Sequence, residues 1–395
     1  MKFSELYRNA REAVDRALRS LWAADACNPQ QEAMGKAIRN LTKDIFAGED
    51  SMPVVQCMNL YESVHSVAPQ QAENLVEGLW DKISPQGPSH FFPFEHQYQS
   101  WDTLLNKKDE QGRPMSICVT TGTGSGKTEC FMLPLVADLN STPKHESSVK
   151  AIFLYPLNAL MEDQKERLEQ LIADTELTYT VYNGDLPEAE PRPDQTDPEH
   201  ERIRNKIKEL RGEYTDENGD VKYRFPKMLY TREMVRKNPP DIILTNPTML
   251  EYILLRKKDE SLIDPALKSL RWIVIDETHS YTGAGAAEMA MLLRRVCLAF
   301  NVNPHELRYA TSSATFGNAK DPAEREKNEL ELRKFISGIT GTSIRQVRVI
   351  DGKRTGTIPE GEDHDRWQLI FDNDFVSLAE LFPTGTVEDK LRALD

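Results

Sequence analysis

Short apolar runs alternate with helical stretches between residues 91 and 316, and this alternation constrains the fold more than any other feature of the chain. The runs are rich in β-branched residues and have the length of strands, whereas the stretches between them place apolar residues at helical spacing. Because the runs are apolar almost throughout, we expect strands that are buried on both faces. The pattern therefore predicts an α/β fold with a mainly parallel sheet that helices cover on both sides. The expected strands are residues 117–120, 151–155, 179–182, 242–245, 272–275 and 309–312.

The alternating region is the central part of the chain. We expect a helical N-terminal region over residues 1–90, because apolar residues there recur at helical spacing and a turn-rich segment closes the region. The α/β domain is expected to span residues 91–320. Within it, residues 186–240 break the alternation and contain seven prolines, which indicates an inserted surface segment. Residues 321–395 are mixed and polar, and we expect a linker or the start of a further domain.

Charge and cysteine content limit where the chain acts and what it binds. The formal net charge is −14, which argues against holding nucleic acid by bulk positive charge. No stretch approaches the ~18 uncharged apolar residues of a membrane span, and the charged N-terminus lacks the apolar core of a signal peptide. The five cysteines include no Cys-x-x-Cys metal half-site. We expect a cytoplasmic protein with reduced thiols and no membrane contact.

A glycine-rich segment joins the expected strand at residues 117–120 to a helix that begins at Lys127. Its composition is that of a Walker A loop, in which backbone N–H groups and a helix N-terminus surround a polyphosphate. We expect Lys127 to reach the β- and γ-phosphates of a nucleoside triphosphate and the Thr128 hydroxyl to ligate Mg²⁺. The first position of the general pattern is Thr121 rather than glycine. The segment is Thr121-Gly122-Thr123-Gly124-Ser125-Gly126-Lys127-Thr128.

Two carboxylates follow the expected strand at residues 272–275. Because the carboxyl ends of parallel strands meet at one edge of a sheet, Asp276 and Glu277 are expected to face the glycine-rich loop. Asp276 suits the Mg²⁺ shell, and Glu277 suits polarisation of an attacking water. His279 is a candidate for coupling this site to neighbouring elements. An isolated Asp-Glu pair is more often a solvated strand end, but beside a Walker A loop it indicates a catalytic site.

The order of these motifs resembles the first RecA-like domain of a superfamily 2 helicase of the DEAD/DEAH-box type. The resemblance spans roughly residues 91–318 and implies ATP as the nucleotide. Upstream of the loop, residues 91–97 resemble the element in which a glutamine, here Gln97, recognises adenine. Ser313-Ala314-Thr315 resembles the element that links ATP hydrolysis to strand movement, which implies coupling roles for Ser313 and Thr315. The third residue of the Asp-Glu box is commonly Ala or Cys in the family, and here it is Thr278.

Further segments resemble the elements with which this family contacts a nucleic-acid backbone. Each follows an expected strand, where hydroxyls, small residues and helix N-termini donate to phosphates without recognising sequence. Alone, each would more often be a capped helix start. Contacts of this kind reconcile nucleic-acid binding with the net charge of −14. The residues implied to contact nucleic acid are Pro156, Asn158, Gly184, Thr245 and Pro247.

Two longer segments indicate which helicases within this family the chain resembles most. Residues 239–252 and 276–284 are similar to the large bacterial helicases of the MrfA/YprA type and to phage-defence helicases of the DISARM and Druantia type. This implies DNA rather than RNA as the partner, in phage defence or DNA repair. These relatives carry a second RecA-like domain with an arginine-rich element and a C-terminal four-cysteine cluster, which we do not find here. We therefore expect the N-terminal part of a larger motor, weakly active by itself.

Other functions stay open at this point. A non-enzymatic alternative is an ATP-gated scaffold in which residues 1–90 dock a partner subunit. A different P-loop enzyme, such as a kinase or GTPase, is disfavoured because no guanine-recognising Asn-Lys-x-Asp pattern is present. The pattern therefore favours a nucleic-acid-dependent ATPase that uses ATP and Mg²⁺.

Overall fold

The computed structural model describes residues 54–56, 75–76, 79, 82, 93–122, 125–141, 147–216, 219–313, 322–352 and 375–377. The chain divides into two units. One unit combines Met1–Leu60 with Arg354–Asp395, and its described part is a two-stranded antiparallel pair of β1 (Val54–Gln56) and β11 (Phe375–Ser377). The other unit, Tyr61–Lys353, contains the α/β domain. The helical region expected over residues 1–90 lies almost entirely outside the described residues, although Val76 and Leu79 are buried in the main core.

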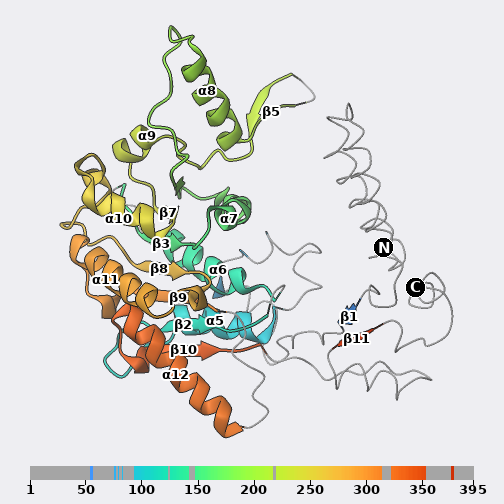
Figure 1. Ribbon diagram of the computed structural model, residues 1–395, viewed down its shortest axis with the longest axis vertical. Coiled ribbons are helices and arrows are strands. Elements are labelled where there is room, and N and C mark those ends of the chain that lie inside the picture. The colour runs from blue at the N-terminus through green and yellow to red at the C-terminus, as the bar shows by residue number, and fades with distance from the viewer. Residues whose placement is uncertain are drawn as a thin grey trace, which may run out of the picture. The chain divides into compact units, whose positions relative to one another are not determined.

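A seven-stranded sheet forms the centre of the larger unit, and every pair of neighbouring strands in it is parallel (Figure 1). The strand order is β10-β2-β9-β8-β3-β7-β4. The α/β fold with a mainly parallel sheet is therefore confirmed. The strands are β2 (Ser116–Val119), β3 (Ala151–Leu154), β4 (Tyr179–Tyr182), β7 (Ile242–Thr245), β8 (Trp272–Ile275), β9 (Arg308–Ser312) and β10 (Val347–Ile350).

The sheet continues past residue 320, where the sequence pattern placed the end of the α/β domain. Helix α12 (Pro322–Thr340) leads to β10, which pairs with β2 at the edge of the sheet. In β10 the two middle residues, Arg348 and Val349, are only partly buried, so the strand lacks the continuous apolar run of a central strand. A short edge strand of this kind gives a weak sequence signal, and the domain is longer than the pattern indicated.

Helices cover both faces of the sheet because the crossover direction reverses along the chain. The chain runs from β2 through α6 (Lys127–Asn140) to β3 and through α7 (Asn158–Ile172) to β4, and it then returns across the sheet. Since parallel crossovers are right-handed, the helices of the return path lie on the opposite face. These are α10 (Pro247–Leu255), α11 (Ala284–Ala299) and α12, which lie together in Figure 1. Helix α5 (Glu95–Leu105) packs beside α6.

The inserted segment contains α8 (Pro198–Arg211), a hairpin of β5 (Glu213–Thr215) and β6 (Val221–Tyr223), and α9 (Arg232–Lys237). It is more than a surface excursion. Leu210, Phe225, Met228 and Val235 are buried in the main core, and the Leu229 N–H donates to the Tyr179 carbonyl at 2.8 Å. The segment therefore packs along β4, the strand at the free edge of the sheet.

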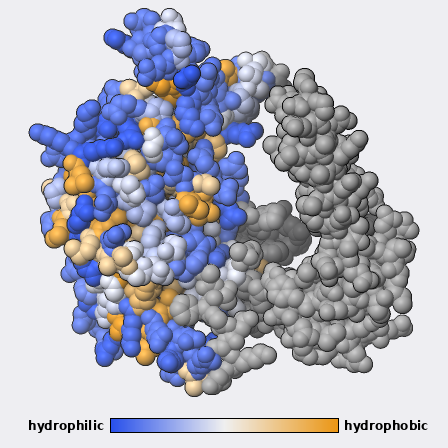
Figure 2. All heavy atoms as spheres, viewed as in Figure 1, coloured by the Kyte–Doolittle hydropathy of each residue, from blue (hydrophilic) through white to orange (hydrophobic). Residues whose placement is uncertain are grey.

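The outer surface of the α/β unit is mostly polar, with hydrophobic patches over α10 and α11 on the left of Figure 2. Leu255, Met291 and Leu298 are exposed there. None of the described helices combines the length and the apolar character that crossing a membrane requires. Among the described cysteines, Cys118, Cys130 and Cys297 are free and buried.

Candidate active site

The carboxyl ends of the strands bring the candidate residues to one edge of the sheet. Strands β2, β9 and β8 are neighbours, and they are followed by the glycine-rich loop, by Ser313 and by Asp276. Strands β3, β7 and β4 are also neighbours, and they end at or just before Pro156, Thr245 and Gly184. The residues expected to bind phosphate and metal thus occupy one half of the edge. The residues expected to contact nucleic acid occupy the other half.

The glycine-rich loop turns directly into α6. Gly126 is the residue before the helix and has φ 71° and ψ 38°, a left-handed conformation that favours glycine. Lys127 and Thr128 form the first turn and are partly exposed, so both side chains are accessible at the helix N-terminus. The hydroxyls of Thr121 and Ser125 are hydrogen-bonded across the base of the loop. Gly122 belongs to the described loop, whereas Thr123 and Gly124 lie outside the described residues.

Helix α5 holds this loop from the side. His96 Nε2 donates to the Ser125 carbonyl at 2.8 Å, which requires the proton on Nε2 because a carbonyl only accepts. Trp101 Nε1 donates to the Glu129 carbonyl at 2.9 Å. Burial lowers the pKa of His96, against the opposing effect of its bond to Ser125. The sequence pattern assigned no role to His96 or Trp101, and their only signal was their place near Gln97, with His96 directly before it and Trp101 four residues after it.

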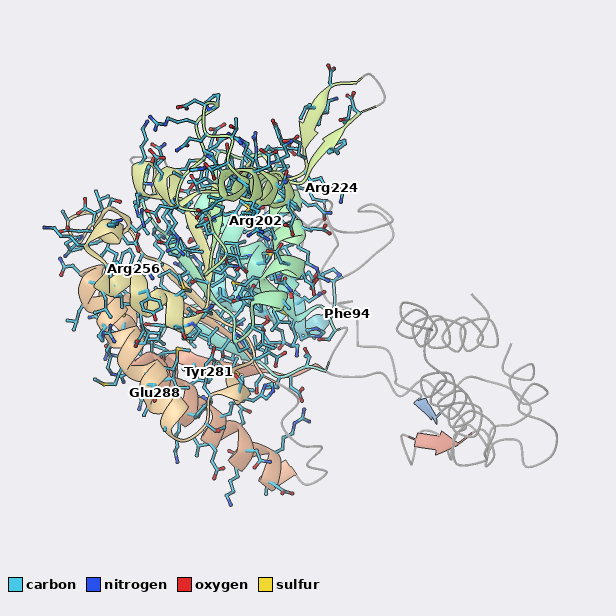
Figure 3. All side chains as sticks on the ribbon, turned by 45° about the horizontal axis from the view of Figure 1, so that its top comes forward. Phe94, Arg202, Arg224, Arg256, Tyr281 and Glu288 are labelled. Carbon is cyan, nitrogen blue, oxygen red and sulfur yellow. The ribbon has the colours of Figure 1, made fainter. Side chains whose placement is uncertain are left out.

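Gln97 is buried and engaged on both ends of its amide. Its Nε2 donates to the Gly126 carbonyl at 3.3 Å, and its Oε1 accepts from the Phe94 N–H at 2.9 Å. Figure 3 labels Phe94 at the start of this helix. The structure therefore places Gln97 against the phosphate loop, and its recognition of adenine stays a prediction. Recognition of adenine by this amide requires it to exchange one of its present partners.

Ser312 joins the two carboxylates to the neighbouring strand. Its hydroxyl donates to Asp276 Oδ1 and accepts from the Glu277 N–H, the latter at 2.9 Å. The Thr278 hydroxyl donates to the Ser312 carbonyl, so the hydroxyl at this box position is used for anchoring. Ser313 is buried, and its N–H donates to the Val119 carbonyl at 3.0 Å. The resemblance assigned coupling to Ser313 and Thr315 and missed Ser312; Thr315 lies outside the described residues.

Glu277 has an unusual backbone. Its φ of 51° and ψ of 47° are left-handed, a conformation that costs non-glycine residues roughly 1–2 kcal/mol. Such conformations persist where surrounding contacts impose them and are concentrated at functional sites. His279 Nδ1 lies 3.1 Å from Glu277 Oε2, so the two candidate side chains are adjacent. Burial and the charge of Asp276 raise the pKa of Tyr281 to about 12, which keeps this neighbouring phenol neutral.

The donor set suits Mg²⁺, which prefers oxygen ligands. Thr128 offers a hydroxyl and Asp276 a carboxylate, and both lie at the carboxyl edge of neighbouring parts of the sheet. Within the described residues, no group of three or more His, Cys, Asp or Glu side chains is arranged to hold a metal alone. A Mg²⁺ ion held by Thr128 and Asp276 would take its remaining ligands from phosphate oxygens and water.

The residues expected to contact nucleic acid differ in exposure. Gly184 and Asn158 are exposed, and Asn158 Oδ1 accepts from Asn246 Nδ2 at 3.0 Å, which links the starts of α7 and α10. Pro156 and Pro247 are partly exposed beside them. Thr245 differs, because its buried hydroxyl donates to the Tyr182 carbonyl at 2.7 Å and is used within the protein.

A cleft of about 280 Å³ adjoins these residues on the side of the insertion. Asn158 from α7 and Asn183 from the loop after β4 line one side, and Lys206 from α8 lines the other. The charged side chains that line the cleft are three acidic and two basic, so its charge does not favour phosphate; they are Glu162, Asp185, Glu209, Lys165 and Lys206. In Figure 3 the labelled insertion residues Arg202 and Arg224 lie well away from Tyr281 beside the carboxylates.

A glycine-rich loop at a helix start, together with an Asp-Glu strand end on the same edge of a parallel sheet, defines a P-loop nucleoside triphosphate-binding domain. The family model of DEAD/DEAH box helicases matches residues 94–199 and 198–322. Because this match covers more than half of the chain, the protein belongs to the DEAD/DEAH box helicase family.

The sequence identity to individual relatives is low. The chain is 26% identical over 359 residues to the Druantia protein DruE of Escherichia coli (strain UMEA 4076-1), covering 73% of this chain and 18% of DruE. It is 27% identical over 274 residues to the uncharacterized ATP-dependent helicase YprA of Bacillus subtilis (strain 168), covering 66% of this chain and 28% of YprA. The chain thus spans less than a third of the length of either relative.

Solved structures with a similar fold include the DUF1998 helicase MrfA bound to DNA. That similarity has a TM-score of 0.44 at 21% identity and covers 80% of this chain and 34% of MrfA. The DEAD-box protein Mss116p bound to single-stranded RNA and AMP-PNP has a TM-score of 0.48 at 13% identity and covers 78% of this chain and 50% of that one. These similarities concern the fold.

Proposed function

We propose that this chain is the ATP-binding part of a helicase or translocase that couples ATP hydrolysis to movement along a nucleic-acid strand. The observation that carries the proposal is the division of one sheet edge. Asp276, Ser313 and the glycine-rich loop follow the neighbouring strands β8, β9 and β2, and Pro156 and Gly184 follow β3 and β4 on the other half. A rigid sheet therefore joins the ATP site to the strand interface. Membership of the DEAD/DEAH box helicase family supports the same function.

The ATP half of the edge has the groups that phosphoryl transfer requires. Backbone N–H groups of the loop and the N-terminus of α6 bind the phosphates, and Lys127 compensates their charge. Mg²⁺, when bound by Thr128 and Asp276, neutralises charge on the β- and γ-phosphates. Glu277 orients the attacking water, and His279 lies beside Glu277 to hold that carboxylate.

Ser312 is the group through which a change at the ATP site reaches the sheet. Its hydroxyl contacts both carboxylate residues, and the backbone of Ser313 bonds to the end of β2. A shift of Asp276 on ATP hydrolysis therefore moves the end of β9 as well. Ser313 follows that strand directly. We propose that Ser313 and Thr315 pass the movement on.

The complete motor is proposed to include a second RecA-like domain. The matches cover only 18% of DruE and 28% of YprA, which leaves room for such a domain in these relatives. An arginine supplied from another domain contributes on the order of 10³–10⁵ in rate, so residues 1–395 alone are expected to bind ATP and hydrolyse it slowly. ATP binding would then close the two domains around the strand, and hydrolysis would reopen them.

We propose that the nucleic acid along which the protein moves is DNA and that the protein acts in phage defence. The DruE relative is a Druantia protein, and its match covers 73% of this chain. The similarity of residues 239–252 and 276–284 to the MrfA/YprA type also supports DNA. The contacts at Pro156, Asn158 and Gly184 involve the backbone of the strand, so they are expected to be independent of base sequence.

The decisive experiment measures ATP turnover with single-stranded DNA, duplex DNA and RNA in the full-length protein. We expect DNA to stimulate turnover and Lys127→Ala to abolish it, because Lys127 is the cation in the first turn of α6 and compensates the phosphate charge. Lys334→Ala is the matched control, since Lys334 is exposed on α12, away from the loop. Unchanged DNA-stimulated turnover in Lys127→Ala would refute the assignment, and stimulation by RNA alone would refute the choice of DNA. ATP binding without turnover under any of these conditions would support the scaffold alternative.

A further inference from the structure

One buried cation of the insertion contacts the loop that follows β4. Arg232 is the first residue of α9 and is only 8% exposed. Its Nε donates to the Leu186 carbonyl at 3.1 Å, and its Nη2 donates to the Asn183 carbonyl at 2.9 Å. Nη1 lies 3.5 Å from the Tyr182 hydroxyl, and the guanidinium lies 4.9 Å from the centre of that ring. The planar guanidinium thus holds several groups in fixed directions.

The loop that Arg232 contacts has an exposed tip and buried ends. Gly184 and Asp185 are exposed, whereas Asn183 and Leu186 on either side are buried. The two carbonyls that Arg232 binds belong to these buried ends, so the side chain fixes the tip at both sides. Gly184 at the tip is one of the residues assigned to strand contact. The position of that contact therefore depends on a residue 48 positions away in the sequence.

The backbone of α9 strengthens this attachment. The Arg232 N–H donates to the Pro187 carbonyl at 2.9 Å, and the Glu233 N–H donates to the Glu188 carbonyl at 2.9 Å. Arg236, one turn later, pairs with Glu188 and lies 2.7 Å from the buried carboxylate of Asp259. Helix α9 is thereby tied both to the loop after β4 and to the 3-10 helix at Lys257–Leu262.

Tyr182 connects Arg232 to the end of β7, where Thr245 lies. Its hydroxyl lies near Arg232, and its carbonyl accepts from the Thr245 hydroxyl at 2.7 Å at the end of β7. Burial, together with the adjacent Asp259 charge, raises the pKa of Tyr182, so the phenol stays neutral within this cluster. The ends of β4 and β7 are therefore held in one arrangement that includes Arg232.

Burying a guanidinium is expensive unless its donors are used, and an apolar side chain would fill the same space without that desolvation cost. The Nε and Nη2 groups of Arg232 donate their hydrogen bonds to carbonyls of the loop after β4. We propose that Arg232 is a positioning residue for nucleic-acid contact, which holds the loop of residues 183–186 so that the Gly184 backbone faces the strand. This inference rests on the proposed function and assigns a role to the inserted segment.

The test compares Arg232→Gln and Arg232→Lys in the full-length protein. The measured quantities are the DNA concentration for half-maximal stimulation of ATP turnover, the KM for ATP, and DNA-free turnover. Loss of charge-assisted hydrogen bonds is expected to raise the half-maximal DNA concentration about tenfold in Arg232→Gln. The KM for ATP and DNA-free turnover should be unchanged, because the glycine-rich loop lies on the other half of the edge. Arg232→Lys, which keeps the charge and loses the planar fork, should give an intermediate value.

Arg211→Gln is the matched control within the insertion. Arg211 lies 3.5 Å from the centre of the Tyr223 ring and 4.7 Å from that of Tyr230, so its loss weakens the insertion without touching residues 183–186. A DNA dependence like the wild type in both Arg232 variants overturns the inference, as does an equal shift in Arg211→Gln. If the wild-type protein shows no stimulation by any nucleic acid, the proposed function fails instead.

Discussion

Gly126 offers the sharpest test of how the phosphate loop is built. Its φ of 71° is left-handed, and a Cβ added there would lie 2.2 Å from Gln97 Nε2. Gly126→Ala therefore introduces two separable effects, backbone strain and displacement of a buried amide. Gly112 provides the matched control, because it has a similar φ of 76° but no atom within 4 Å of an added Cβ.

The two effects have different magnitudes. The left-handed backbone costs an alanine roughly 1–2 kcal/mol, and this applies to both glycines. At Gly126 the Gln97 amide must also leave the Gly126 carbonyl, which it contacts at 3.3 Å. A lost hydrogen bond of this kind is worth about 1 kcal/mol. We expect Gly126→Ala to lower the free energy of unfolding by about 2–3 kcal/mol and Gly112→Ala by about 1–2 kcal/mol.

Urea unfolding of the single variants and of Gly126→Ala combined with Gln97→Ala separates these contributions. The double variant removes the amide that an alanine at position 126 would meet, so its loss of stability should be smaller than the sum of the two single losses. An unchanged urea dependence ensures that the midpoints report stability. Equal losses at Gly126 and Gly112, or strict additivity with Gln97→Ala, would refute the reasoning. Binding of a fluorescent ATP analogue should weaken in Gly126→Ala and stay unchanged in Gly112→Ala.

Three further predictions concern the strand interface and the support of the loop. No atom lies within 4 Å of a Cβ added at Gly184, so Gly184→Ala should leave the melting temperature unchanged and weaken single-stranded DNA binding in an anisotropy titration. Arg167 Nη1 lies 2.8 Å from Glu129 Oε1, with the side chains 49% and 17% exposed, so a double-mutant cycle should give about 0.2–1 kcal/mol, less at high salt. Burial lowers the pKa of His96 from 6.5, so below pH 6.5 the unfolded chain binds a proton that the folded chain does not. Stability should therefore fall as the pH drops below 6.5, and less steeply in His96→Gln.

Each of these predictions has a result that contradicts it. Wild-type DNA affinity in Gly184→Ala would mean that no strand approaches this backbone. A coupling energy of zero between Arg167 and Glu129 would show that the contact between α7 and α6 does not link the two helices energetically. Identical pH profiles of the free energy of unfolding for His96→Gln and the wild type would show that His96 takes up its proton in the folded state.

Sequence patterns located the parts of this domain well where the signal is local. Six expected strands correspond to β2, β3, β4, β7, β8 and β9 within about one residue at each end, a normal uncertainty of boundaries. They were recognisable because strands buried on both faces are apolar throughout, and the fully buried patterns of β2, β3 and β4 agree. The glycine-rich loop was recognisable because its backbone needs glycines at fixed spacing beside a helix start.

Patterns failed where the decisive contact joins distant segments. Arg232 looks like an ordinary charged residue of a polar insertion, and only the fold shows it buried against the carbonyls of Asn183 and Leu186. Ser312 looks like the end of a strand, and its contacts with Asp276 and Glu277 depend on β9 lying next to β8. The sequence around such residues does not reveal their role, because the order of strands in the sheet determines which distant residues they contact.

The sequence by itself therefore determined the strand and helix segments, the phosphate loop and the carboxylate pair, since each depends on the properties of neighbouring residues. The tertiary structure alone decided the strand order, the division of the sheet edge, the use of Gln97 and His96 to hold the loop, and the attachment of the insertion to the interface. These features arise because parallel strands are joined by long crossovers, so residues far apart along the chain become neighbours at one edge.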